Sequence, residues 1–572
     1  MATLSWDGSA PPSGRTETTR EVESGVPGLR LRVTAIGAAE VAVDVSADRP
    51  GVLLVAAAPL GPVDGGPMRV RIEWRLPCAG ATALWRPGTD TRWLPPSWSR
   101  PREASFANGA AVGSLVGAGD AALFTFAVAE RVLPVTIGEG AVEETGDFAC
   151  WVEQDGAPTL RLDLTGRQFS ETVLEMAHWW ADGPVPVPAA AFEPVFCTWY
   201  ARHLEITAAE VERLAALAAP LGFTGLIVDD GWQTAETSRS YATTGDWVPA
   251  FPDFAGHVRR VQELGLAYLL WCALPFAGDR SAAGQRFAGH RLAHREELET
   301  SVLDPAVPEV RAHLVERLSA LVAEYGLDGL KVDFIDTFAR SGGDAASIRQ
   351  LLADLAAALP SGLLVEHRQP YTGPGLWPYA TMVRATDCPH NAAENRQRTA
   401  DLRLTCGPLA VHADPLTWHP SESPAEIAVL VQNVLFATVQ VSVDLGVQSP
   451  EQLAALKFWL SVSRDHVDLL QRGEFRAHRP DLGYPLLAAS HGTARGYGRY
   501  APVPIEADAD WTLLLVANAD PDPVVRLSFP KPLGPVTVLV QGPTGAVLTR
   551  TTVDGAQVEA RVPRGGLLTL TR

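Results

Sequence analysis

The feature that most constrains the fold is an alternation of short apolar strands and helical segments between residues 192 and 444. Eight candidate strands occur there: Val195–Tyr200, Thr224–Asp229, Ala267–Ala273, Asp328–Phe334, Gly362–Glu366, Thr381–Thr386, Pro408–His412 and Thr438–Asp444. Helical segments separate most of them, and two begin with capping-box patterns at Thr207–Glu210 and Ser423–Glu426. Eight β units over about 270 residues fit a closed (β/α)8 TIM barrel better than an open sheet. No G-x-G-x-x-G motif follows the first strand, which argues against a dinucleotide-binding fold.

The segments on both sides of this alternation are rich in short strands and turns. Period-two runs such as Leu29–Val33, Val41–Val45 and Trp511–Val516 are typical of half-buried antiparallel strands. We therefore predict a multidomain chain with a large N-terminal antiparallel β-sandwich over residues 1–188, the barrel over 189–474 and a small C-terminal β-sandwich over 475–572. The proline-rich segment Gly183–Pro188 is the predicted first boundary.

Charge and hydropathy limit the partners. The net charge of −19 repels phosphate backbones and anionic lipids, so we expect no nucleic-acid and no membrane partner. The longest apolar run, Leu264–Gly278, is too short to span a bilayer, and residues 1–15 show no signal peptide. The six cysteines lie far apart in sequence and are expected to be reduced. These features predict a cytoplasmic protein without a metal or organic cofactor; whether it forms a homo-oligomer stays open.

Reactive side chains gather where the predicted barrel strands end, the edge at which such barrels place their active sites. They are Asp229 and Asp230, Trp271, Lys331 and Asp333, Glu366 to Arg368, Arg384 and Asp387, and His412. Carboxylates and cations can hydrogen-bond sugar hydroxyls, and tryptophan can stack on the apolar face of a sugar ring. The pattern therefore favours a carbohydrate, an oligosaccharide or glycoside, as the substrate.

Each residue also has a structural interpretation. The sequence Asp-Asp-Gly is also typical of a turn, and Trp271 could belong to the core. Lys331 and Asp333 interrupt a buried strand, where charges are costly unless they are paired or functional. The chain has only three lysines among its 47 basic residues, and this scarcity favours a functional Lys331.

The order of motifs resembles glycoside hydrolase family 36, the α-galactosidase family that also includes plant raffinose synthases. The matching segments span nearly the whole chain: FCTWY at 196–200, DDGWQ at 229–233, GDW at 245–247, LDP at 303–305, KVD at 331–333 and TD at 386–387. The resemblance implies that Asp333 is the nucleophile and Asp387 the acid/base. It also implies that Asp229, Asp230 and Lys331 bind galactose hydroxyls and that Trp271 forms a wall of the sugar pocket.

The chain departs from the family pattern in two places. The Asn-Arg pair that follows the family's K-W-D motif is missing, and a Cys- and Gly-rich segment is replaced by residues 366–375, EHRQPYTGPG. Arg368 could pair with Glu366 as scaffolding, or it could point into the pocket, bind substrate and reject a 2-acetamido group. Arg384 is a further candidate substrate-binding residue.

The resemblance favours a retaining, exo-acting α-glycosidase, with α-galactosidase preferred. A transglycosylase of the raffinose-synthase type and a catalytically silent carbohydrate-binding protein remain alternatives. Because Asp387 must hold a proton for the first step, its surroundings are expected to be less cationic or more apolar than those of Asp333.

Overall fold

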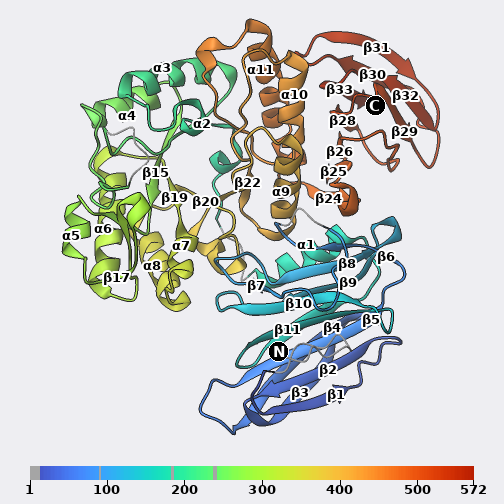
Figure 1. Ribbon diagram of the computed structural model, residues 1–572. Coiled ribbons are helices and arrows are strands. Elements are labelled where there is room, and N and C mark those ends of the chain that lie inside the picture. The colour runs from blue at the N-terminus through green and yellow to red at the C-terminus, as the bar shows by residue number, and fades with distance from the viewer. Residues whose placement is uncertain (1–12, 89–91, 182–185, 236–240) are drawn as a thin grey trace.

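The computed structural model describes residues 13–88, 92–181, 186–235 and 241–572. The middle of the chain forms a parallel barrel, the N-terminal part forms one antiparallel sandwich and the C-terminal part forms a second (Figure 1). The predicted multidomain architecture is therefore confirmed. The exact domain limits remain predictions, and residues 182–185 of the proposed first boundary lie outside the described part of the chain.

The barrel contains the eight predicted strands. In chain order they are β13 (Val195–Cys197), β14 (Gly225–Val228), β15 (Ala267–Ala273), β19 (Gly329–Asp333), β20 (Leu364–Arg368), β21 (Met382–Arg384), β22 (Ala410–His412) and β23 (Gln440–Val441). Each pairs in parallel with its neighbours, in the order β22-β21-β20-β19-β15-β14-β13-β23. Parallel bridges from His412 to Thr438 and from Leu416 to Val441 link the two ends of this sheet and close the barrel.

The helices of this region are α2 (Trp199–Arg202), α3 (Ala208–Ala218), α4 (Phe254–Gln262), α5 (Ala282–Arg286), α6 (Pro308–Tyr325), α7 (Ile335–Arg340), α8 (Ala345–Ala358), α9 (Ala392–Thr405), α10 (Pro424–Asn433), α11 (Pro450–Asp465) and α12 (Val467–Leu470). Most of them surround the barrel, whereas α5 packs on the inserted strand β16 (Phe276–Gly278) and α12 on β25 (Leu486–His491) and β26 (Ala494–Arg499) of the C-terminal sheet (Figure 1). The predicted starts of α3 and α10 are confirmed, since Thr207 and Ser423 each accept a hydrogen bond from the third helical amide. None of the helices in the described ranges is long and apolar enough to cross a membrane.

Two features interrupt the regular strand–helix alternation. A small sheet of β16 (Phe276–Gly278), β17 (Arg291–Arg295) and β18 (Thr300–Leu303) is inserted after β15. Between β20 and β21 the chain forms only a short 3-10 helix, η5 (Pro374–Tyr379). This stretch contains most of the segment in which the sequence departs from the family pattern.

The N-terminal sandwich consists of two six-stranded sheets around a core that includes Trp74, Phe124 and Phe126. One sheet contains β1 (Glu17–Val22), β2 (Arg30–Ile36), β5 (Arg69–Pro77), β11 (Asp147–Asp155), β10 (Val135–Val142) and β7 (Arg102–Ala104). The other contains β3 (Ala38–Arg49), β4 (Val52–Pro62), β12 (Thr159–Asp163), β9 (Ala122–Val128), β8 (Val112–Gly117) and β6 (Ala81–Trp85). The expectation that this region is all-β is wrong in one place: α1 (Phe169–Trp180) is a helix whose buried side packs on β9 and on α9 of the barrel.

The C-terminal region pairs a seven-stranded sheet with a three-stranded one. The first contains β24 (Glu474–His478), β25 (Leu486–His491), β26 (Ala494–Arg499), β28 (Leu513–Asn518), β33 (Gly566–Thr571), β30 (Val536–Gln541) and β31 (Val547–Val553); the second contains β27 (Ile505–Glu506), β29 (Val524–Ser528) and β32 (Gln557–Arg561). A buried polar cluster joins all three regions. Trp85 of the N-terminal sandwich donates to Tyr484 at 2.7 Å, and Arg92 pairs with Asp401 of α9 at 2.7 Å. All six cysteines are free, as expected.

Candidate active site

The inward-facing residues of the barrel form an apolar layer below a charged one. Strand side chains alternate between the two faces of a sheet, and in a barrel one of these faces is the interior. The apolar layer is a cluster of small and branched residues: Val195, Cys197, Ile227, Leu269, Leu364, Met382 and Ala410. Above it, towards the C-terminal ends of the strands, the next inward positions carry Asp229, Lys331, Glu366, Arg384 and Gln440. The interior thus changes from apolar to charged at the end where barrel enzymes bind substrate.

Lys331 and Asp229 form a buried ion pair at this level. Lys331 Nζ donates to Asp229 Oδ2 at 2.5 Å, and the two side chains are only 7% and 4% exposed. Burial alone would lower the pKa of Lys331, but the adjacent Asp229 carboxylate outweighs burial and raises it above its usual value. Lys331 is therefore held as a cation by Asp229.

Asp333, the predicted nucleophile, ends β19 and accepts hydrogen bonds on both carboxylate oxygens. Arg368 Nε donates to Oδ1 at 2.5 Å, and Trp271 Nε1 donates to Oδ2 at 3.1 Å. Burial would raise the pKa of Asp333, but Arg368 and Lys331 outweigh it and hold this pKa well below its ordinary value. Asp333 is consequently a carboxylate, the form that a nucleophile requires.

The pKa of Asp230 is shifted in the direction opposite to that of Asp333. The Asp230 side chain is almost fully buried, and its Oδ1 accepts from Gln233 Nε2 at 2.6 Å. Burial, with a further contribution from the charge of Asp229, raises the pKa of Asp230 to about 7 in spite of that hydrogen bond. Burial thus shifts the pKa of Asp230 upward, whereas Arg368 and Lys331 shift the pKa of Asp333 downward.

Arg384 of β21 lies among three carboxylates. It pairs with Asp414, donates to Asp387 Oδ1 at 2.9 Å, and its Nε lies 3.8 Å from Glu366 Oε1. Asp387, the predicted acid/base, has a side chain that is 55% exposed. Desolvation raises its pKa, but Arg384 and Arg368 dominate and lower it. The expectation that Asp387 has less cationic surroundings is therefore wrong for the free protein, because Arg384 is its direct partner.

The segment Glu366–Arg368 divides between the two faces of β20. Glu366 and Arg368 point into the barrel, whereas His367 faces a largely apolar cavity of about 330 Å³ beside Leu352 and Leu355 of α8. Arg368 contacts Asp333 and not Glu366, so the scaffolding alternative for Arg368 is wrong. His367, which the sequence groups with the other side chains at the barrel rim, lies on the outer face of β20 instead.

Trp271 and His412 are both buried. Trp271 packs against the rings of Tyr241 and Trp247 while its indole nitrogen reaches Asp333. His412 is fully buried, where Nε2 contacts the Ala191 carbonyl at 2.7 Å and burial lowers its pKa to about 4. The structure thus places Trp271 beside the candidate nucleophile and His412 within the barrel interior.

Sequence reasoning missed two residues of this site. Tyr371, fully buried, directs its hydroxyl at both Val332 O and Asp333 Oδ1, at 3.1 and 3.2 Å. Asp414 accepts from the Cys388 amide at 2.8 Å and from Tyr200 at 3.1 Å, and burial raises its pKa to about 6. The spacing of His412 and Asp414, two positions apart at the end of β22, was the available signal for Asp414; Tyr371 lies in the divergent segment and had none.

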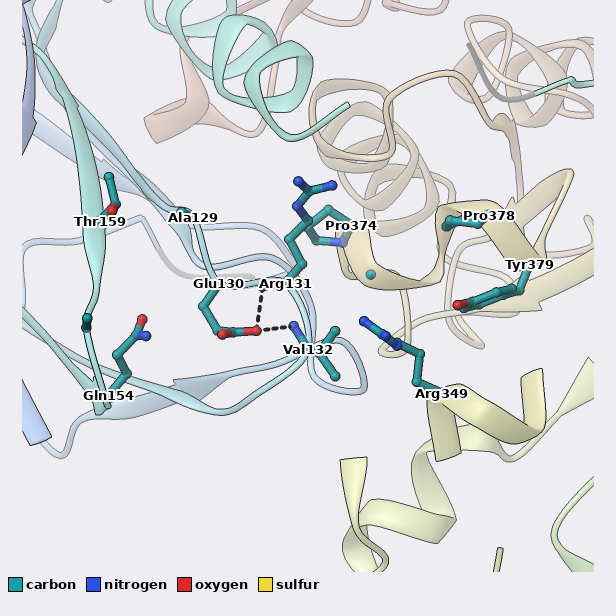
Figure 2. Close-up of a pocket in the computed structure, with 12 residues that line it drawn as sticks. Ala129, Glu130, Arg131, Val132, Gln154, Thr159, Arg349, Pro374, Pro378 and Tyr379 are labelled. Carbon is teal, nitrogen blue, oxygen red and sulfur yellow. Dashed lines mark hydrogen bonds between the residues drawn. The ribbon is translucent and has the colours of Figure 1, made fainter. Parts of the chain in front are cut away.

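A second hollow, of about 440 Å³, lies where the N-terminal sandwich meets η5 and α8 (Figure 2). Arg131, Gln154, Arg349 and Tyr379 contribute to its wall. Its one acidic lining residue, Glu130, accepts hydrogen bonds from the amides of the three residues that follow it. Since Glu130 is the single acid among the described residues that line it, this hollow offers no pair of carboxylates for glycoside chemistry.

Comparison with known proteins agrees with this geometry at the level of fold. No family model matches the chain, and no curated protein matches it in sequence. Among solved structures, a family 36 α-galactosidase from Geobacillus stearothermophilus aligns with a TM-score of 0.63 and 14% identity over 97% of this chain and 86% of that one. An α-galactosidase from Lactobacillus brevis aligns with a TM-score of 0.62 and 14% identity over 97% and 85%, and one from Thermus thermophilus with 0.57 and 18% over 81% and 96%.

The chain thus belongs to the class of proteins that carry a central (β/α)8 barrel between two β-sandwiches. More particularly, it has the fold of the family 36 α-galactosidases, and the resemblance read from the motifs is confirmed at the level of fold.

Proposed function

We propose that this protein is a retaining, exo-acting α-glycosidase and that its substrate is a neutral oligosaccharide or glycoside ending in an α-galactosyl residue. The observation that carries the proposal is the state of Asp333: a buried, ionised carboxylate at the C-terminal end of a barrel strand, held by Trp271 and Arg368. A buried carboxylate kept ionised at this edge of a barrel is suited to nucleophilic attack.

In the first step, a lone pair of Asp333 attacks the anomeric carbon. The glycosidic C–O bond breaks, its electron pair leaves with the aglycone oxygen, and that oxygen takes the proton from Asp387. In the second step, Asp387 removes a proton from water, whose oxygen attacks the same carbon. The ester bond to Asp333 then breaks and its electrons return to the carboxylate. Two inversions at one carbon give net retention.

Proton donation requires a change at Asp387. In the free protein Arg384 favours its ionised form. A sugar that covers this half-exposed carboxylate removes water from it, and desolvation raises a carboxyl pKa. Arg384 still has Asp414 and Glu366 beside it, so loss of its contact with Asp387 does not leave a lone buried cation.

Substrate recognition is assigned to Asp229, Asp230 and Lys331, with Trp271 as a wall. The choice of galactose rests on the resemblance in motifs and on the solved relatives. The Geobacillus enzyme was crystallised with raffinose, and the Thermus enzyme with p-nitrophenyl α-D-galactopyranoside.

The test is a panel of nitrophenyl glycosides. We expect turnover of the α-galactoside, little of its N-acetylated counterpart, and an α-configured first product by NMR. In a crystal structure the carboxyl groups of Asp333 and Asp387 should lie roughly 5–5.5 Å apart; a separation of about 6.5–9.5 Å would indicate inversion instead. Excess sugar acceptor distinguishes hydrolysis from transfer.

One observation favours a second candidate function, a carbohydrate-binding protein without turnover. In the free protein the candidate proton donor Asp387 is paired with Arg384, which lowers the pKa of Asp387 and favours the form that cannot donate a proton. Binding of α-galactosides without hydrolysis of any nitrophenyl glycoside would support this alternative.

A further inference from the structure

The two oxygens of Asp333 have unequal surroundings. Oδ1 accepts from Arg368 Nε at 2.5 Å, from the Phe334 amide at 2.8 Å, and from Tyr371, whose single proton is shared with the Val332 carbonyl. Oδ2 accepts one hydrogen bond from the described residues, donated by Trp271 at 3.1 Å. A carboxylate oxygen has about two lone-pair sites, so Oδ1 is saturated and Oδ2 keeps one lone pair free.

We propose that Arg368 and Tyr371 are positioning residues that fix Asp333 through Oδ1 and so leave Oδ2 as the attacking oxygen. This inference rests on the proposed function. It assigns to the divergent segment a task that acts through the nucleophile: Arg368 orients Asp333 and supplies positive charge beside it.

Arg368 is itself held in place. Its guanidinium lies over the ring of Phe334, 5.4 Å from the ring centre, and its side chain is 17% exposed. Phe334 has a left-handed backbone (φ 65°), a conformation that is costly for a bulky residue, and its amide donates to Asp333 Oδ1 at 2.8 Å. Both partners of Asp333 on this side are therefore restricted, as a preoriented nucleophile requires.

The charges that face Asp333 come from several elements. The cations are Lys331 of β19 and Arg368 of β20. The other titratable groups that interact with Asp333 are Asp230 after β14, Cys272 of β15, Asp336 of α7 and Tyr371. Arg384 of β21 is engaged by Asp387 and Asp414 instead. Lys331 is committed to Asp229. Among the residues that the structure describes, Arg368 is the cation in direct contact with Asp333, and its removal takes that contact away.

The experiment compares the pH dependence of kcat/KM for the wild type, Arg368→Gln, Arg368→Lys and Tyr371→Phe. The acidic limb of this profile reports the pKa of the free enzyme's nucleophile. Without the Arg368 cation the pKa of Asp333 rises, so we expect the limb of Arg368→Gln to move up by about one pH unit or more. We also expect kcat/KM at neutral pH to fall roughly tenfold to a hundredfold.

In Arg368→Lys the acidic limb should lie close to its wild-type pH, because a positive charge is restored beside Asp333. Tyr371→Phe should lower kcat with KM nearly unchanged, because its loss loosens Oδ1 without touching the sugar. The matched control is Arg340→Gln, which removes an exposed cation from α7 that pairs with Asp336 and should leave the profile unchanged. Should Arg368→Gln fail to fold, the lysine and Tyr371 variants still decide the matter.

The outcomes separate the two proposals. A 2-deoxy-2-fluoro α-galactosyl fluoride should label Asp333 in the wild type. A labelled and active wild type whose acidic limb is unmoved in Arg368→Gln overturns the positioning role alone. Absence of both label and turnover in the wild type overturns the proposed function, and this inference with it.

Discussion

Replacement of Lys331 by methionine is the most direct test of the buried ion pair. Methionine keeps most of the side-chain length and removes the charge, which leaves the Asp229 carboxylate, 4% exposed, without its cation at 2.5 Å. Removing one partner of a buried pair costs about 3–5 kcal/mol because the other charge stays buried and uncompensated.

The size of the melting shift follows from the chain length. With an unfolding entropy of about 2.1 cal/mol/K per residue, 572 residues give about 1.2 kcal/mol/K if the chain unfolds in one transition. A loss of about 3–5 kcal/mol then lowers Tm by roughly 2.5–4 °C. Differential scanning calorimetry resolves a shift of this size, and separate unfolding of the barrel would enlarge it.

Two further variants make the test specific. Lys331→Met with Asp229→Asn removes both charges and should recover at least half of the loss, because no unpaired carboxylate remains. Arg472→Met breaks an exposed pair with Asp468, where the side chains are 55% and 60% exposed, and should cost under about 1 kcal/mol. If Lys331→Met melts like Arg472→Met, the pair contributes nothing and the reasoning about buried charge is refuted.

Three other predictions concern the aspartates. Asp333→Asn should abolish hydrolysis of nitrophenyl α-galactoside while Tm stays near that of the wild type; Asp336→Asn, a neighbouring buried acid without a role in the chemistry, is the control and should stay active. Asp387→Asn should lower kcat about 10²–10⁴-fold on an oligosaccharide and much less on the nitrophenyl glycoside, whose leaving group needs little protonation; equal losses on both would contradict its role as acid. Since burial raises the pKa of Asp230 to about 7, the folded protein keeps a proton there that the unfolded chain releases near its ordinary pKa. Wild-type stability should therefore fall relative to Asp230→Asn as pH rises from about 4 through 7, by roughly 4 kcal/mol; parallel Tm curves at pH 5 and pH 8 would contradict it.

The barrel could be predicted from sequence because its signals are local. Each strand is a short apolar run, and helix starts such as Thr207 and Ser423 are marked by their own side chains. The helix α1 was missed because its residues follow a long all-β segment, and its buried face is satisfied only by packing on β9 and α9. Tertiary packing, which no local pattern records, decides that element.

The sequence predicts which charged residues gather at the site, but it does not predict which of them contact one another. Period-two spacing places Lys331 and Asp333 on one face of β19, and the strand ends mark Asp230 and Arg384. The partner of each charge depends on strand register: Lys331 could have paired with Asp333 in its own strand but pairs with Asp229, two strands away in the sheet. The prediction that Asp387 has less cationic surroundings was wrong for the same reason: those surroundings depend on the direction in which Arg384 points.

The three arginine and lysine side chains at the rim of the barrel also limit what the site can bind. They come from the adjacent strands β19, β20 and β21, and each contacts a carboxylate: Lys331 with Asp229, Arg368 with Asp333, and Arg384 with Asp387 and Asp414. An anionic ligand would have to compete with these carboxylates for cations that they already neutralise. A neutral polyol can instead donate hydroxyl hydrogens to the carboxylates and accept from the remaining N–H groups without separating a charge pair. The pairing of charges across neighbouring strands therefore favours an uncharged sugar over an anionic one.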